Sequence, residues 1–146
     1  MKPGIGADTN ILFSGLYFGK AASSIIRLVR FKKTDLFVSE YIKDELLAIC
    51  KRKNLPLKVL SIFFSLDNVH IIKDESYFDK EKFKDAKILI HDEKDVPIYC
   101  FAKKMFEYNK IEYFITGDKD LLDEKVRNSA HGRILSLAEF NEIMGL

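Results

Sequence analysis

Short apolar runs alternate with helical apolar patterns along the whole chain. The short runs predict strands at 4–8, 35–38, 69–72, 113–116 and 133–135. The apolar positions between them recur with helical spacing and predict helices near 11–16, 21–32, 40–53, 56–66, 74–87, 95–106 and 137–144. Strands that alternate with helices indicate a mainly parallel sheet with helices on both faces. The sequence therefore predicts an α/β fold, a three-layer α/β/α sandwich around a mainly parallel sheet of about five strands.

Local signals refine some of these elements. Pro3, Gly4 and Gly6 weaken the first run, which predicts a strand that is frayed or near an edge of the sheet. Ser39 is a good N-cap for the helix that follows it, and Asp95 could be an N-cap or a first-turn acid of its helix. These signals place helix starts directly after polar residues.

The size and charge of the chain restrict the class of protein. Its 146 residues suit a single domain spanning 1–146, and a domain of this size buries about 68–70% of the surface of the unfolded chain. The net charge is only +2, so any surface that binds nucleic acid must come from local segregation of lysines and arginines. No signal region and no apolar stretch of membrane-spanning length occur. We expect a soluble cytoplasmic protein without a membrane partner.

Several carboxylates occupy positions where ligands bind in α/β proteins. Asp8 follows the first predicted strand, whereas Asp118 and Asp120 follow the fourth. Loops at the carboxyl ends of parallel strands meet at one edge of the sheet, where ligands bind. Glu45 lies near the apolar face of its helix and Asp95 begins another helix, so acids from four elements could share one divalent cation.

Each of these acids also has a structural explanation. Asp8 and Asp95 could cap the helices that follow them, and Asp118 could stabilise a turn at Gly117. Glu45 is harder to explain, because a charge near a buried face is costly without a partner. That partner could be a metal ion or a lysine in a buried salt bridge.

Four motifs in order resemble those of the PIN-domain family of metal-dependent ribonucleases, in particular the toxins of toxin–antitoxin pairs. The residues that carry the likeness are 8–12 with 14–16, Ser39 with Glu45, 92–95 with Ala102, and 116–122. The spacing to Ala102 favours Asp95 over Asp92 as the third acid. The closing segment 133–140 also resembles the last strand and helix of the family.

The resemblance implies a function and a set of site residues. It implies an endoribonuclease in which Asp8, Glu45, Asp95 and Asp118 are catalytic and hold Mg²⁺ or Mn²⁺, with Asp120 as a further metal ligand. Asn10 and Thr116 would fix the carboxylates by hydrogen bonds. It also implies an RNA substrate, a homodimer and a possible antitoxin protein as partner.

The remaining candidates concern substrate binding and other functions. Lys119, Lys103 and Lys104 are expected beside the acids, where they would bind flanking phosphates of RNA. One alternative is a PIN-like module that binds RNA or protein without cutting it. Another is a phosphoacceptor domain, although only one acid, Asp8, follows the first strand.

Overall fold

A five-stranded parallel sheet forms the centre of the molecule. The computed structural model describes residues 2–146, so Met1 of the predicted domain 1–146 lies outside the described residues. The strands are β1 (Gly4–Ala7), β2 (Leu36–Ser39), β3 (Val69–Ile72), β4 (Ile111–Ile115) and β5 (Ile134–Leu135). They lie in the order β3-β2-β1-β4-β5, and every neighbouring pair is parallel. The predicted number and direction of strands are confirmed.

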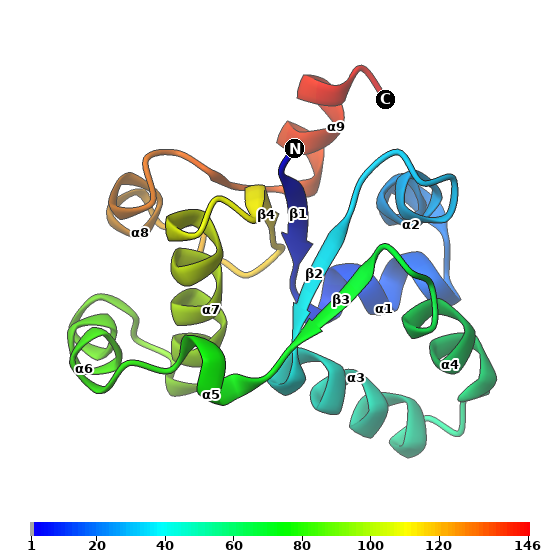
Figure 1. Cartoon of the computed structure of the whole chain (residues 1–146), viewed down its shortest axis with the longest axis horizontal. Helices are drawn as coiled ribbons and strands as arrows, with labels where there is room; N and C mark the ends of the chain where they lie inside the picture. The colour runs from blue at the N-terminus through cyan, green and yellow to red at the C-terminus, as the bar shows by residue number, and fades with distance from the viewer. Residues whose placement is uncertain (1) are drawn as a thin grey trace.

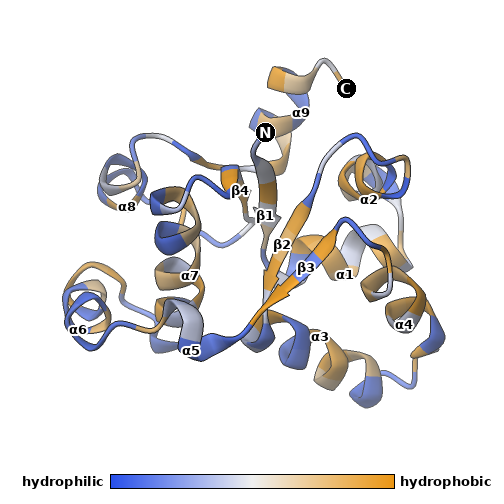
Figure 2. Ribbon diagram, viewed as in Figure 1, coloured by the Kyte–Doolittle hydropathy of each residue, from blue (hydrophilic) through white to orange (hydrophobic). Residues whose placement is uncertain are grey.

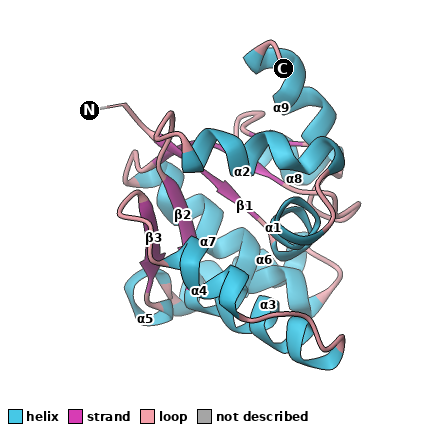
Figure 3. Ribbon diagram, turned by 90° about the vertical axis from the view of Figure 1, so that its right-hand side faces the viewer, coloured by secondary structure: helices cyan, strands magenta, loops and turns pink. Residues whose placement is uncertain are grey.

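Helices cover the sheet on both sides. They are α1 (Thr9–Tyr17), α2 (Ser23–Arg30), α3 (Glu40–Arg52), α4 (Lys58–Phe64), α5 (Asp74–Tyr77), α6 (Lys80–Leu89), α7 (Val96–Glu107), α8 (Glu124–Ser129) and α9 (Leu137–Met144). Short 3₁₀ turns, η1 (Lys20–Ala22) and η2 (Glu93–Asp95), precede α2 and α7. In Figure 1, α1 to α4 lie on one side of the strands and α5 to α8 on the other. In the view turned by 90°, α1 to α4 face the viewer (Figure 3). The fold is the expected three-layer α/β/α sandwich.

The core follows the strands and the inward faces of these helices. Figure 2 shows that β2 and β3 are coloured as hydrophobic along most of their length. Phe63 of α4, Phe101 of α7 and Phe114 of β4 are each at most 1% exposed. Burying a large apolar side chain contributes about 1.5–3 kcal/mol, so these rings are strong anchors between the helices and the sheet. Among residues 2–146, every helix is too short or too polar to cross a bilayer.

The first strand lies at the centre of the sheet, and the expectation of a frayed or edge position was wrong. β1 pairs with β2 on one side and β4 on the other, and all its residues are buried. Its glycines reflect crowding: a Cβ on Gly4 would lie 2.4 Å from the backbone oxygen of Asp35, and one on Gly6 would lie 2.8 Å from the Phe114 ring. The close approach of neighbouring groups therefore explains why glycines occur in this strand, although glycines in isolation disfavour strand formation.

Helix boundaries follow the polar caps closely, with two differences. Ser39 accepts a hydrogen bond from the Ile42 amide at 3.1 Å, as expected of an N-cap. The pattern predicted over 74–87 forms two helices, because Phe78 is extended and the Asp79 side chain caps α6. α8 was not predicted, since only Val126 of its six residues is buried and no apolar period marks it.

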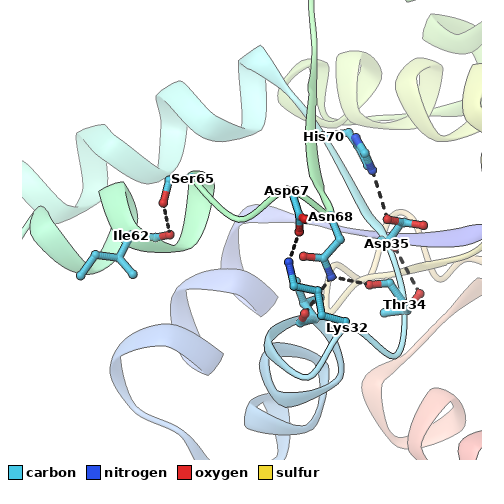
Figure 4. Close-up of polar contacts among 9 residues, drawn as sticks. Lys32, Thr34, Asp35, Ile62, Ser65, Asp67, Asn68 and His70 are labelled. Carbon is cyan, nitrogen blue, oxygen red and sulfur yellow. Dashed lines mark hydrogen bonds and ion pairs between the residues drawn. The ribbon is translucent and has the colours of Figure 1, made fainter.

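A polar cluster organises the amino ends of β2 and β3 (Figure 4). The Asn68 side-chain amide donates to the carbonyl oxygens of Val29 and Thr34, at 2.7 and 2.8 Å. His70 lies on β3, with its ring 3.2 Å from an Asp35 carboxylate oxygen. These contacts fix the loop that leads from α2 into the sheet, at the edge opposite the carboxyl ends of the strands.

Candidate metal centre

The candidate site begins at the carboxyl ends of β1 and β4. From β1 the chain adds β2 and β3 on one side, and it then returns to add β4 and β5 on the other. The carboxyl ends of the two strands that flank such a reversal are where open α/β sheets bind ligands. Ala7 pairs with Ile115, and the Asp8 amide donates to the Ile115 carbonyl oxygen at 3.1 Å. Asp8 and Thr116 therefore leave the sheet side by side.

Hydrogen bonds hold the Asp8 carboxylate on both oxygens. Oδ1 accepts from the Ile11 amide at 3.1 Å, so Asp8 does cap α1. Oδ2 accepts from the Thr116 hydroxyl, which in turn accepts from the Asp118 amide at 3.0 Å. Burial raises the pKa of Asp8, and the bonds from Thr116 and the backbone oppose that rise in part. Thr116 thus positions both Asp8 and the loop that carries Asp118.

Glu45 lies in the second turn of α3, and its side chain reaches the start of α1. It is half-buried and accepts a hydrogen bond from the Thr9 hydroxyl at the start of α1. No salt bridge involves Glu45 within residues 2–146, so the lysine partner considered as an alternative is not found there. Tyr41 lies nearby, and burial together with the charges of Glu45 and Asp95 raises its pKa. Within the described residues, the Glu45 carboxylate therefore has a hydroxyl donor and no cation within salt-bridge distance.

Asp95 lies in η2 directly before α7, and its side chain makes no capping hydrogen bond. Asp95 therefore occupies the N-cap position of α7, as considered, but its side chain does not cap the helix. The residue is only 6% exposed, and its Oδ2 atom is buried with no hydrogen-bond partner. Burial, with the nearby charges of Asp118, Asp92 and Asp120, raises the pKa of Asp95 to about 7. A buried carboxylate oxygen without a donor is costly, which makes this atom a natural position for a cation.

Asp92 and Asp120 surround Asp95. One oxygen of each of the three carboxylates lies within 4.8 Å of the other two. Asp92 was set aside at the sequence level in favour of Asp95, but the structure brings both into one cluster. Residues three apart lie on the same side of a 3₁₀ turn, so the spacing of the two acids was the available signal. Asp120 lies with Asp118 in the loop that follows β4, and its amide donates to Asp118 Oδ1 at 2.8 Å.

One cavity of about 180 Å³ collects most of the predicted acids. Its lining residues are Asp8, Thr9, Asn10, Glu45, Ile49, Asp92, Lys94, Asp95, Ile98 and Asp118. Asn10 lines the cavity but is exposed, and within residues 2–146 its side chain makes no hydrogen bond to a carboxylate. The hydroxyls of Thr9 and Thr116 provide those bonds. Sequence reasoning missed Thr9, which no spacing rule distinguishes from Asn10.

The predicted lysines separate into two groups. Lys119 is exposed in the loop between Asp118 and Asp120, as expected. Lys103 and Lys104 instead line a different cavity that shares no residue with the acidic one. They lie eight and nine positions beyond Asp95 along α7, which at about 1.5 Å per residue separates them from it by about 12 Å along the helix. Their expected position beside the acids was therefore wrong, whereas Lys94 was missed and lines the acidic cavity.

The donor set suits a hard divalent cation. Mg²⁺, Mn²⁺ and Ca²⁺ prefer oxygen ligands, and opposite ligands of one such ion lie about 4–5 Å apart. The oxygens of Asp92, Asp95 and Asp120 fall within that spacing, and the unpartnered Asp95 Oδ2 supplies a buried ligand atom. The cluster could hold a divalent metal ion.

Comparisons with known proteins add no relative. No family model matches the chain, and no curated protein matches it. The likeness to PIN-domain ribonucleases therefore rests on the sequence motifs. The described residues themselves establish a parallel α/β sandwich with a possible acidic metal site at its topological switch point.

Proposed function

We propose that this protein is a metal-dependent endoribonuclease that hydrolyses RNA phosphodiester bonds at the acidic cavity. The observation that carries the proposal is the buried, unpartnered oxygen of Asp95 among converging carboxylates at the carboxyl edge of the sheet. The resemblance of four ordered motifs to PIN-domain ribonucleases supplies the reaction class. Mg²⁺ or Mn²⁺ is the proposed cofactor, because the donors are all carboxylate oxygens.

The residues of the site divide into ligands and supports. Asp92, Asp95 and Asp120 would hold the ion, and Asp8, Glu45 and Asp118 line the cavity that Asp92 and Asp95 also line. A divalent ion bound there would supply Lewis acidity, which would favour a hydroxide nucleophile and would balance negative charge on the phosphate. Thr116 and Thr9 keep the Asp8 and Glu45 carboxylates oriented by donating to them.

Two cations close to the acids are suited to the RNA backbone. Lys94 lines the cavity and Lys119 is exposed in the loop that carries two of the acids. Their positive charges would hold phosphates on either side of the bond to be cut and would offset the repulsion between RNA and the carboxylates. Replacing Lys119 by methionine should weaken RNA binding and reduce the dependence of affinity on salt.

The proposal extends to the biological setting. The likeness to the toxin branch of the family makes an antitoxin protein the proposed regulator, a homodimer the proposed assembly and the cytoplasm the proposed location. A chain of this kind would be held inactive by a partner that covers the acidic cavity. Size measurement in solution tests the dimer independently of activity.

Cleavage of a labelled RNA tests the proposed activity. Wild-type protein should cleave in Mn²⁺ or Mg²⁺ and should stop when EDTA is added. Asp95→Asn should abolish cleavage, because it keeps the size of the side chain and removes the charge, whereas the exposed Asp44→Asn on α3 should cleave like wild type. Metal-independent cleavage, or full activity of purified Asp95→Asn, would refute the proposal. RNA binding without cleavage in any metal would favour the non-cleaving module.

A further inference from the structure

A second cavity, of about 490 Å³, lies between α6, α7 and the segment that leads into β5. It shares no lining residue with the acidic cavity. Its volume falls in the range of about 300–1,000 Å³ that is typical of sites for small molecules. Its lining residues are Tyr77, Lys82, Asp85, Tyr99, Cys100, Lys103, Lys104, Phe106, Glu107, His131 and Arg133.

Two of the cations in this cavity already share one carboxylate. The Lys82 ammonium lies 2.7 Å from Glu107 Oε2, and the Lys104 ammonium lies 3.9 Å from the same oxygen. These contacts raise the pKa of Lys82 and lower that of Glu107. The negative charge of Glu107 is therefore paired with Lys82 and Lys104, which also line the cavity.

Within residues 2–146, the other two cations donate hydrogen bonds only to backbone carbonyl oxygens. Lys103 donates to the Ser129 carbonyl oxygen at 2.5 Å. Arg133 donates through Nε to Glu112 O at 3.0 Å and through Nη2 to Ile111 O at 2.7 Å. Neither forms a salt bridge within residues 2–146. Each retains N–H donors and a full charge that no carboxylate balances.

The charges of the cavity match a dianion. Four cations and the two carboxylates Asp85 and Glu107 leave a net charge of +2 when His131 is neutral. A phosphate monoester carries about −1.5 to −2 charges at pH 7 and presents several strong acceptor oxygens. Lys103 and Arg133 could therefore be neutralised together by one terminal phosphate, with the guanidinium donating to it as a fork.

The walls of the cavity explain why the ligand should carry more than a phosphate. The Arg133 guanidinium lies over the Phe106 ring, 4.4 Å from its centroid, and the Tyr99 hydroxyl is held 2.5 Å from Ser129 Oγ. These rings form fixed apolar surface beside the cations. Burial also lowers the pKa of Lys103, because water is kept from its ammonium group, and a bound anion would replace that lost solvation.

We propose that this cavity is a binding site for a terminal phosphate monoester carried on a nucleotide, held by Lys103 and Arg133. The phosphate of a free mononucleotide and the phosphorylated end of an RNA strand share this chemistry. The inference does not depend on the proposed nuclease, because no residue of the acidic cavity takes part.

Calorimetric titration of the full chain in EDTA tests the site, since EDTA removes any metal that could bring phosphate to the acids. The probes are inorganic phosphate, AMP, and a trinucleotide RNA with a 5′-phosphate or a 5′-hydroxyl. We expect AMP to bind more tightly than inorganic phosphate. Preference for AMP over the trinucleotides identifies a free nucleotide as the ligand, and preference for the 5′-phosphorylated trinucleotide identifies an RNA end.

Matched variants assign binding to the cavity. Lys103→Gln should weaken AMP binding about tenfold or more, because a charge-assisted hydrogen bond is lost. Lys84→Gln removes one exposed charge from α6 outside the lining of the cavity and should leave binding unchanged. In wild type, AMP should also protect Lys103, and not Lys84, from lysine acetylation measured by mass spectrometry. The proposal is overturned if every probe binds more weakly than about 10 mM, if the two variants bind alike, or if the tightest-binding phosphate monoester gives no protection of Lys103.

Discussion

Replacing Asp95 by asparagine should stabilise the metal-free protein while removing its response to metal. The substitution keeps the shape of the side chain and deletes a negative charge that is buried beside Asp92 and Asp120. In the absence of a cation, that charge opposes folding. In the presence of a cation, the same charge contributes to binding.

The structure sets the size of the effect. A pKa that rises from 3.8 unfolded to about 7 folded means that the folded state loses about 4 kcal/mol of stability once the group is ionised. A pair of charges 4.8 Å apart repels by about 3.5 kcal/mol at an effective dielectric constant of about 20, which is the same order. An amide left without a full set of partners costs about 1–3 kcal/mol. The expected net gain for Asp95→Asn is about 1–3 kcal/mol at pH 8.

The sign of the pH dependence follows from proton binding. Below the unfolded pKa of 3.8, Asp95 is protonated in both states and its burial carries no charge penalty. Between 3.8 and about 7, the folded state binds a proton that the unfolded state has lost, so stability falls as pH rises. The advantage of the variant should therefore grow across that window and stay constant above it.

Urea unfolding in EDTA, repeated from pH 4 to 8, measures this difference. Addition of Mn²⁺ at a hundred times its dissociation constant should stabilise wild type by about 2.7 kcal/mol and the variant by much less. The exposed Asp44→Asn should change stability by less than about 0.5 kcal/mol and keep the metal response. A variant that is less stable than wild type in EDTA at pH 8, or that responds equally to Mn²⁺, would refute the reasoning.

Two further predictions concern the support of the site and the centre of the sheet. Thr116→Val should cost about 1–3 kcal/mol and weaken Mn²⁺ binding, because Asp8 loses a buried donor, whereas Thr116→Ser should restore both; denaturation and Mn²⁺ titration check this. Gly4→Ala should destabilise by about 1–3 kcal/mol, because its Cβ would lie 2.4 Å from the backbone oxygen of Asp35. Gly117→Ala, where a Cβ meets nothing within 4 Å, is the matched control, and equal melting temperatures of the two variants would contradict the packing argument.

The fold was largely predictable because local signals and tertiary structure agree. The closing helix α9 begins after Ser136 as expected, since the Ser136 and Glu139 side chains form a reciprocal capping box. The central position of β1 could not be predicted from its own residues. Gly4 and Gly6 lower strand propensity, but they are needed here because Asp35 and Phe114 approach the strand closely. α8 was missed because it buries a single residue and is set by its Asp123 cap rather than by an apolar face.

The candidate site was predictable in its residues more than in its geometry. The positions of Asp8 and Asp118 follow from parallel strands that end at one edge of the sheet. The choice between Thr9 and Asn10, and the joining of Asp92 to the cluster, depend on side-chain directions that only packing fixes. Lys103 and Lys104 lie away from the acids because they are eight and nine residues beyond Asp95 along α7.

The most direct test of the account is the location of a bound ion. Crystals soaked in Mn²⁺ should show an anomalous diffraction peak within about 2.0–2.6 Å of carboxylate oxygens of the cluster, with Asp95 Oδ2 among the ligands. The Asp95→Asn crystal, treated in the same way, should show a much weaker peak or none. A strong peak at another site with none in the acidic cavity, or an equal peak in the variant, would contradict the central claim that this cluster is a metal centre.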